Sequence, residues 1–424
     1  MPVGQPAGQG RTPVTVIDQT EDLRHALADH LIAAGCITSP QVAAAFRAVP
    51  RHLFTPEVPR EQAYRPYHHV RVKYDARGAT ISSVSAPYVQ AIMLEQAHLT
   101  PGMRCLEIGS GGCNAALMAE LVGPGGQVTT VDIDADIVAR ARRFLADAGY
   151  PHVHVVHADA AQGVPQRAPF DRIIVTAGVW DVPPAWREQL TDDGCIVLPL
   201  RMRGLSRSVA LVRDGDRLVS LSHHMAGFVP MQGADAYTER QVPLHGDHVT
   251  LRVCEDDILD VDGPALSAAL QQPRVARWSG VTCGREPIDQ LYLWLATSLD
   301  WFGLLASSRS ETAAALVRPI WALSNPTLVG EDSFAYLTLR DTDLVTGHVE
   351  FGAYAHGPQA AELAEALVEQ IRVWDRHYRY GPPARISIAP ASTPVEASRP
   401  GVRVIRKRHT TVTITWPPPD SHWP

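Results

Sequence analysis

The sequence predicts an α/β fold built on a mostly parallel, doubly wound Rossmann-like sheet, followed by a C-terminal α+β domain. Short apolar strands alternate with helices between residues 100 and 200, which is typical of a parallel sheet covered on both faces. A glycine-rich turn follows the first of these strands, and acidic residues end the next ones. Beyond residue 231, strand-like runs surround one long amphipathic helix instead.

The chain has 424 residues, whereas an ordinary domain has about 100–200 residues. We therefore expect several consecutive regions. They are a flexible tail over residues 1–20, a helical and loop region over 21–99, the parallel-sheet domain over 100–230 and the α+β domain over 231–424.

Two helices are predicted before the sheet. Residues 21–35 form an amphipathic run closed by Gly35, and residues 39–48 form a second run that ends before Pro50. The next segment, residues 51–67, is rich in proline and aromatic residues. We expect it to be ordered but irregular and to lie over a surface.

The sheet itself is predicted from apolar runs at residues 103–108, 127–132, 152–159, 171–178 and 195–200. Helices are expected over residues 114–123 and 134–150, and a helix containing Trp186 and Leu190 is expected before the fifth strand. A hairpin over residues 208–222 is expected to finish the sheet. In the last domain we expect a helix over 358–379 and strands at 334–340, 348–354, 385–389 and 412–416.

The composition excludes several classes of protein. The net charge is −7, with 38 basic and 45 acidic residues, whereas a general nucleic-acid binder needs a basic field. No apolar run reaches the ~18 residues of a membrane helix, and the first residues lack the apolar segment of a secretory signal. The six cysteines form no C-x-x-C pair, so no metal site is expected. We expect a soluble cytoplasmic protein that binds neither nucleic acid nor membranes.

The residues that carry chemistry begin with Glu107 and the glycine turn at residues 109–112. Such a turn between a strand and a helix lets a ligand approach the backbone closely, with the helix amides facing it. Asp132 ends the next strand, where a carboxylate can bind both hydroxyls of a ribose, and Asp159 ends the strand after that, near an adenine amino group. An adenosine-containing ligand is indicated. A hydride cofactor would also fit the turn and Asp132, but Asp159 and Glu107 favour S-adenosylmethionine.

From about residue 51 to residue 200 the sequence resembles protein-L-isoaspartate O-methyltransferases. The resemblance rests on the segments Pro50-Arg51-His52-Leu53-Phe54, Val84-Ser85-Ala86-Pro87-Tyr88, Leu106-Glu107-Ile108-Gly109-Ser110-Gly111 and Phe170-Asp171-Arg172-Ile173-Ile174-Val175-Thr176. It implies a class I methyltransferase fold, S-adenosylmethionine as the cofactor and a protein or peptide carboxylate as the methyl acceptor.

The resemblance also implies which residues form the site. The acceptor carboxylate would meet the serine of the serine-alanine-proline turn and the serines before it, which are Ser85, Ser83 and Ser82. The cofactor would be bound by Glu107, Gly109, Ser110, Gly111, Gly112, Asp132, Ile133, Asp159, Ala160 and Thr176. Residues 21–99 would then supply the substrate loops, residues 100–230 the cofactor domain and residues 231–424 the recognition of a peptide.

The sequence departs from the family's pattern in several places. The glycine turn is one residue shorter than usual, Cys113 replaces an aromatic residue, and Tyr88 stands where His is common. The family's repair enzymes are also much shorter chains. These departures resemble a divergent branch encoded with ribosomally made, modified peptides of the lanthipeptide type, whose members carry an extra C-terminal domain.

The function implied by that branch is esterification of an Asp side chain in a modified precursor peptide, leading to aspartimide, isoaspartate or both. Three alternatives stay open. The chain could repair isoaspartate in damaged proteins, methylate a small molecule, or be a catalytically dead peptide-binding protein.

Three roles stay open for Ser85. Its hydroxyl could orient the acceptor carboxylate, because an Asp carboxylate is already ionised at neutral pH and needs position more than a base. A nucleophilic serine would need a nearby His and an orienting acid. A helix N-cap before Pro87 is the purely structural role.

Two polar segments outside this motif also have two interpretations each. Asp181 follows the fourth strand and could line the acceptor side or hold a turn. The basic run at residues 403–408 is expected to be a solvated edge strand or a contact for an acidic peptide.

Overall fold

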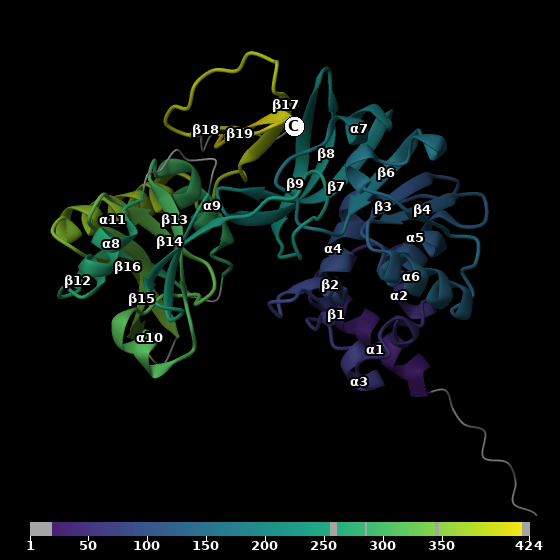
Figure 1. The fold of residues 1–424 in the computed structure, drawn as a ribbon, viewed down its shortest axis with the longest axis horizontal. Coiled ribbons are helices and arrows are strands. Elements are labelled where there is room, and N and C mark those ends of the chain that lie inside the picture. The colour runs from purple at the N-terminus through teal and green to yellow at the C-terminus, as the bar shows by residue number, and fades with distance from the viewer. Residues whose placement is uncertain (1–18, 255–260, 285, 344–346, 418–424) are drawn as a thin grey trace, which may run out of the picture.

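The computed structural model describes residues 19–254, 261–284, 286–343 and 347–417 and has two lobes (Figure 1). The first lobe contains a ten-stranded sheet with the helices around it, and the second contains a seven-stranded sheet. Of the predicted tail at 1–20, residues 1–18 lie outside the described residues, and Gln19 and Thr20 already belong to the first helix.

The N-terminal region forms the predicted helices and a small hairpin. Its elements are α1 (Gln19–Ala33), α2 (Pro40–Ala48), η1 (Arg51–Phe54), α3 (Arg60–Ala63), β1 (Val70–Tyr74), β2 (Thr80–Val84) and α4 (Pro87–Ala97). Helix α2 begins where expected because the Ser39 hydroxyl accepts a hydrogen bond from the Val42 amide. The chain leaves α1 through Gly35, whose φ of +71° favours glycine.

The five predicted strands form the parallel part of the large sheet. They are β3 (Arg104–Ile108), β4 (Gln127–Asp132), β5 (His154–His157), β6 (Phe170–Val175) and β7 (Leu190–Met202), in the spatial order β7-β6-β3-β4-β5. The connecting helices are α5 (Cys113–Val122), α6 (Ala135–Asp147) and the short α7 (Pro184–Glu188). The α/β class with a doubly wound sheet is confirmed, and these five strands are parallel, but the ten-stranded sheet as a whole is mixed, because five of its nine pairings are antiparallel. The prediction that Leu190 is helical is wrong, because Leu190 begins β7.

The hairpin predicted over 208–222 exists as β8 (Leu205–Asp214) and β9 (Arg217–Met225), but it does not finish the sheet. The chain returns from its C-terminal end to add β17 (Arg385–Pro390), β19 (Thr410–Thr415) and β18 (Val402–Arg406) beyond β9. Ser387 of β17 pairs with Val219 of β9. The predicted boundary at residue 231 therefore does not separate the two sheets.

The seven-stranded sheet is antiparallel throughout, in the order β10-β11-β13-β14-β15-β16-β12. Its strands are β10 (Arg240–His245), β11 (Val249–Val253), β12 (Val275–Cys283), β13 (Phe302–Ser307), β14 (Asn325–Val329), β15 (Phe334–Asp343) and β16 (His348–His356). The predicted long helix is α11 (Ala360–His377), which packs on β12, β15 and β16 and buries Leu367, Ile371 and Trp374. Smaller helices are α8 (Gly263–Leu270), α9 (Asp289–Ser298) and α10 (Glu311–Leu316).

The basic run at residues 403–408 joins the lobes instead of standing free in solvent. Arg403 donates to the backbone oxygen of Thr297 at 2.9 Å and pairs with Asp300 at 2.9 Å. Lys407 is only 7% exposed and its ammonium group donates to the backbone oxygens of Trp180 and Arg201. Strand β18 is indeed an edge strand, but the expectation that this run is solvated is wrong for Lys407, because its charge is bound by buried carbonyl groups.

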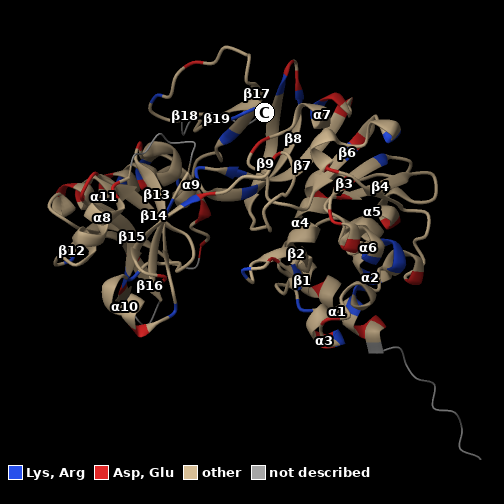
Figure 2. Ribbon diagram, in the orientation of Figure 1, with Lys and Arg blue, Asp and Glu red and all other residues tan. Residues whose placement is uncertain are grey.

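Further features that bear on function are the distribution of charge, membrane-spanning helices, metal clusters and disulfides. Figure 2 shows acidic and basic residues interspersed over both lobes. Within the described ranges, no helix combines the length and apolar character that crossing a membrane requires. The same residues contain no cluster of three or more His, Cys, Asp or Glu side chains arranged to hold a metal ion. No disulfide joins any two of the six cysteines.

Candidate active site

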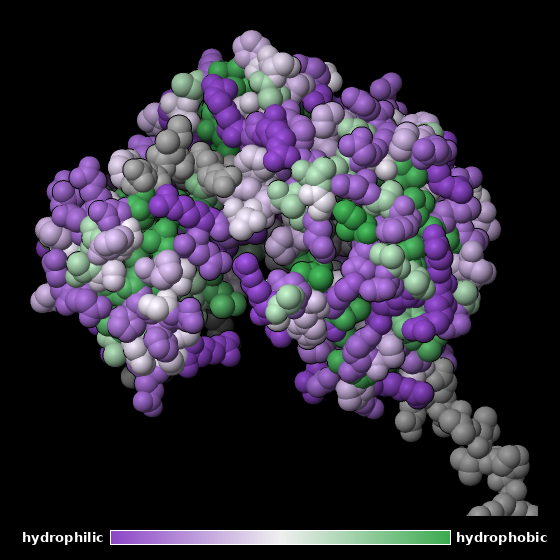
Figure 3. Space-filling view, viewed as in Figure 1, coloured by the Kyte–Doolittle hydropathy of each residue, from purple (hydrophilic) through white to green (hydrophobic). Residues whose placement is uncertain are grey.

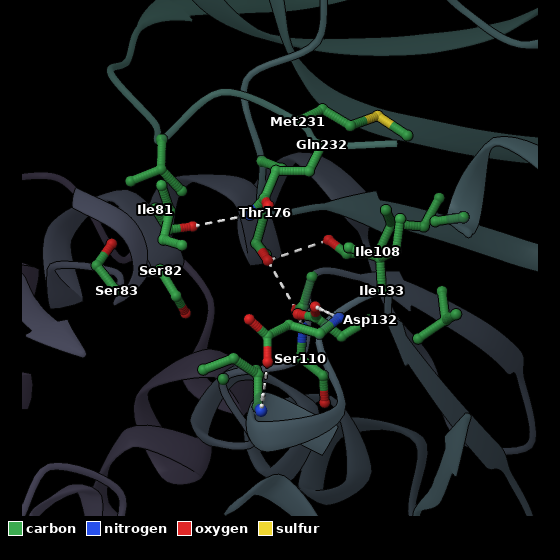
Figure 4. Close-up of a pocket in the computed structure, with 18 of the residues that line it drawn as sticks. Ile81, Ser82, Ser83, Ile108, Ser110, Asp132, Ile133, Thr176, Met231 and Gln232 are labelled. Carbon is green, nitrogen blue, oxygen red and sulfur yellow. Dashed lines mark hydrogen bonds between the residues drawn. The ribbon is translucent and has the colours of Figure 1, made fainter. Parts of the chain in front are cut away.

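An open cavity lies where the parallel strands β3, β4 and β6 end (Figure 4). The floor comes from the residues that follow these strands, and the opposite wall from β2 and a segment at residues 229–232, which we call the roof segment. The sequence-predicted residues that line it are Ser82, Ser83, Gly109, Ser110, Gly111, Asp132, Ile133, Ala160 and Thr176. This is the edge of an α/β sheet where ligands bind.

The glycine turn is held against the end of β6. Gly109 has φ +96°, and a Cβ atom there would lie 2.6 Å from the Thr176 hydroxyl. That hydroxyl donates to the Gly109 backbone oxygen at 2.9 Å. Gly112 has φ +78° and is the N-cap of α5, with a Cβ there lying 3.1 Å from the Phe54 ring. The positive φ angles favour glycine at both positions, and a side chain would also collide with Thr176 at Gly109 and press on the Phe54 ring at Gly112.

Asp132 presents its carboxylate at the cavity. One oxygen accepts from the Ser110 amide and the other from the Asp134 amide, both at 2.9 Å. Burial raises the pKa of this carboxyl, and the backbone amides oppose that rise. The Ser110 hydroxyl beside it is buried and has no hydrogen-bond partner among the described residues. A buried polar atom at a cavity wall is suited to a ligand that supplies the missing partner.

Three of the predicted cofactor residues do not line the cavity. Glu107 is fully buried behind it, where one carboxylate oxygen accepts from the Thr130 hydroxyl at 2.6 Å, and burial raises the pKa of Glu107 to about 7. Asp159 accepts from the amides of Ala161 at 2.9 Å and Ala234 at 2.8 Å. Gly112 caps α5. Glu107, Gly112 and Asp159 therefore shape the site from behind, and the binding roles predicted for them stay predictions.

The wall opposite the glycine turn is held together by one hydrogen bond and tied to the floor by a pair of salt bridges. The side-chain amide of Gln232 in the roof segment donates to the Ile81 backbone oxygen of β2 at 3.4 Å (Figure 4). Lys73 of β1 pairs with Asp134 at 2.6 Å and Asp136 at 2.8 Å, at the start of α6. These contacts hold the β1–β2 hairpin over the cavity.

A second, larger opening adjoins this cavity. It is a groove of about 1690 Å³ between the two lobes, and Ser83 and Val229 line both spaces. Ser85, the predicted acceptor-side serine, lines the groove and not the first cavity. Ser82 lines only the first cavity. The three predicted serines thus run from the cavity into the groove.

The turn that carries Ser85 is fixed by a buried arginine. Arg51 is 3% exposed, and its guanidinium donates to the backbone oxygens of Ser85 and Ala63 and to the Gln90 side chain, each at 2.7 Å. Ala86 is the N-cap of α4, so the suggestion that Ser85 caps this helix is wrong. Pro87 does occupy the first turn. Within the described part of the chain, the Ser85 hydroxyl has no hydrogen bond, including none to a His that could serve as a base.

Asp181 has a structural role. It is 3% exposed, and its carboxylate accepts from the His409 amide at 2.6 Å and from the Thr410 hydroxyl. Of the two interpretations of this residue, the structure supports holding a turn, because both oxygens bind the β18–β19 connection.

Several residues at the two spaces could not be predicted from the sequence. Met231 and Gln232 line the cavity, while Arg71, Trp321 and Leu323 line the groove. Among these, Arg71 could have been found from a predicted β1–β2 hairpin, because it lies opposite Ser83 in the pairing of these strands. The others come from segments far along the chain and carry no motif.

Comparisons with known proteins give the family. A model described as protein-L-isoaspartate(D-aspartate) O-methyltransferase (PCMT) matches residues 22–236. The protein-L-isoaspartate O-methyltransferase of Methanococcoides burtonii is 42% identical over 200 residues, which cover 46% of this chain and 94% of that protein. The enzyme of that name from Pyrococcus horikoshii is 37% identical over 212 residues, covering 49% and 92% respectively.

A solved structure of a protein-L-isoaspartate O-methyltransferase covers 86% of this chain and 96% of its own, at 21% identity and a TM-score of 0.47. The residues matched by the family model include the cofactor cavity and the serine turn, and the family match confirms the class I methyltransferase fold. The chain belongs to the protein-L-isoaspartate(D-aspartate) O-methyltransferase family, a family of S-adenosylmethionine-dependent carboxyl O-methyltransferases.

Proposed function

We propose that this protein transfers a methyl group from S-adenosylmethionine to an Asp side-chain carboxylate in a ribosomally made, modified peptide. The observation that carries the proposal is the meeting of two spaces at Ser83 and Val229. One is a cavity at the ends of the parallel strands, and the other is a long groove that runs between the lobes. This arrangement fits a nucleoside donor and a peptide acceptor that react where the spaces join.

The residues of the cavity fit the proposed donor. Gly109 leaves room beside the backbone that a Cβ atom would fill, and the Asp132 carboxylate faces the cavity, where it could accept from ribose hydroxyls. The partnerless Ser110 hydroxyl supplies one further polar group. When bound, S-adenosylmethionine supplies a methyl group on a positively charged sulfur.

For this reaction the protein must position the acceptor carboxylate and exclude water, and it needs no general acid or base. The acceptor carboxylate is ionised at neutral pH, and a carbon–oxygen bond forms as the carbon–sulfur bond breaks, so the two opposite charges cancel. In this proposal the Ser85 hydroxyl donates to one carboxylate oxygen and leaves the other to attack. The positive charge of Arg71, opposite Ser83, attracts the carboxylate to this point. The roof segment and the β1–β2 hairpin shield the reacting atoms from water.

The ester has a second fate that needs no further residue. The backbone nitrogen after the modified Asp attacks the ester carbonyl, methanol leaves, and a five-membered aspartimide closes. Water then opens the ring to Asp or isoaspartate. A small residue after the Asp favours closure, because bulk impedes the attack.

Repair of isoaspartate in damaged proteins is the second candidate. The curated relatives that favour it carry the name protein-L-isoaspartate O-methyltransferase and are up to 42% identical over the residues matched. The relatives named above cover 46% and 49% of this chain, so the second lobe is what favours a dedicated peptide substrate.

A matched pair of synthetic peptides distinguishes the two candidates. The peptides have one sequence containing Asp-Gly, with either a normal or an isoaspartyl linkage, and methylation is followed by mass spectrometry. Our proposal expects the Asp peptide to gain a methyl group and then to lose the elements of water relative to the starting peptide. Methylation of the isoaspartyl peptide alone would establish repair and refute esterification of Asp.

A further inference from the structure

The outer wall of the peptide groove is a turn of the second lobe at residues 321–324, which we call the apolar turn. Two of its large apolar side chains are exposed, Trp321 at 47% and Leu323 at 64%, and both line the groove. Figure 3 shows the surface hollowed between the two lobes. Large apolar side chains gathered at a hollow indicate contact with another molecule more than isolated exposed residues do.

The apolar turn is held in place by its backbone, not by its side chains. The Ala322 carbonyl accepts from the Ser307 amide at 2.6 Å, and the Leu323 carbonyl accepts from the Arg252 guanidinium at 3.0 Å. Arg252 is itself bound to Glu239 at 2.7 Å. Trp321 and Leu323 are thus presented on a fixed backbone although their side chains remain exposed, which lowers the entropy lost when a partner binds.

The facing wall comes from the first lobe and also offers apolar surface. Tyr67 is 60% exposed, Met225 is 36% exposed, and both line the groove, as does Phe228. Aromatic and Met side chains on two sides of a groove are common where a peptide is bound.

The groove also carries four arginine side chains. Arg71, Arg201, Arg207 and Arg252 all line it. Glu239 binds both Arg201 and Arg252, and Asp289 pairs with Arg207 at 3.0 Å, whereas the described residues offer Arg71 no ion pair. A negative charge is therefore favoured at the inner end of the groove, and apolar groups are favoured along its outer part.

From these observations we propose that the apolar turn selects the peptide substrate. The peptide places its acidic side chain beside Ser83 and Arg71, and large apolar side chains flanking that acid pack against Trp321 and Leu323. The substrate class is thus an acidic site within an apolar or aromatic stretch of peptide. This inference rests on the proposed function, because the acidic side chain of the peptide must reach the methyl donor.

The test compares W321A/L323A with the matched control W301A/L221A. Trp301 and Leu221 are similarly exposed, at 43% and 53%, but lie outside the residues that line the groove. The probes are two synthetic peptides centred on Asp-Gly, one flanked by Phe and Leu and one flanked by Ser. Binding is measured by calorimetry in the presence of S-adenosylhomocysteine, and methylation by mass spectrometry.

We expect the wild-type protein to bind the apolar peptide at least about tenfold more tightly than the Ser peptide. W321A/L323A should remove most of that difference, while W301A/L221A and the affinity for S-adenosylhomocysteine stay unchanged. Equal binding of the two peptides by the wild-type protein, or full preference retained in W321A/L323A, would overturn the inference. Preferential binding of the apolar peptide without its methylation would support the selection and refute the proposed reaction instead.

Discussion

Glu107 should make the stability of the ligand-free protein fall as pH rises from about 4.5 to about 7. Its carboxyl is fully buried, and burial raises its pKa from 4.5 to about 7. In the unfolded chain the group ionises near its ordinary value. Between these two values the folded state holds a proton that the unfolded state has released, so each increase in pH favours unfolding. At about 1.4 kcal/mol per pKa unit, the full penalty is about 3 kcal/mol.

The substitution Glu107→Gln removes this titration and keeps an oxygen that can accept from the Thr130 hydroxyl. The free energy of unfolding, measured in urea at pH 5 and at pH 8.5, should fall by about 2.5 kcal/mol less in E107Q than in the wild-type protein, because part of the penalty is already present at pH 5. At pH 8.5 the variant should be the more stable of the two. The control is Glu362→Gln, at an exposed position on α11. Identical pH dependence in E107Q and the wild-type protein would refute the burial of an ionisable carboxyl at this position.

Further predictions concern binding and turnover. Gly109→Ala should abolish binding of S-adenosylhomocysteine in calorimetry, because its Cβ would lie 2.6 Å from a hydroxyl, whereas Gly125→Ala, with its nearest atom at 4.0 Å, should bind normally. Ser85→Ala should lower methyl transfer at least about tenfold with unchanged affinity for the cofactor product; unchanged turnover would remove Ser85 from the site. Arg51→Met should lower both turnover and the urea-measured stability, the latter by at least about 2 kcal/mol, because buried carbonyls lose their donor. Arg408→Ala should weaken cofactor binding several-fold, because Arg408 donates to the backbone oxygen of Ala234, whose amide binds Asp159 behind the cofactor cavity; equal affinity would show that the cavity is independent of the C-terminal strands.

The parts of the fold that follow from local pattern could be predicted from the sequence. Strands β3, β4 and β6 are short apolar runs with turn signals at their ends, and the glycine turn after β3 places the cofactor cavity. The turn carrying Ser85 could be located from its motif as well. Its buried anchor could not, because nothing in the sequence says that the Arg51 guanidinium reaches Ser85, 34 residues further along the chain.

The parts that depend on pairing between distant segments could not be predicted. Strand β17 has an alternating pattern that any sheet with one buried face would accept, so the pattern does not say that its neighbour is β9. The apolar turn is a similar case. Trp321 and Leu323 would be taken for core residues from their type alone, and only the position of the second lobe shows that they line a groove.

The return of the C-terminal strands explains why the two lobes cannot be assigned to separate tasks by cutting the chain. The connection between β18 and β19 holds the residues that follow the roof segment, since Arg408 donates to the Ala234 backbone oxygen at 3.0 Å and His409 contacts Asp235 at 2.8 Å. Ala234 in turn binds Asp159 behind the cofactor cavity. A chain ending at residue 230 would lose these contacts and expose the edge of β9 that β17 covers. Its failure to methylate would therefore follow from a damaged cofactor cavity as readily as from lost peptide recognition. Substitutions in the apolar turn change only the groove, so they isolate the contribution of the second lobe to choosing the substrate.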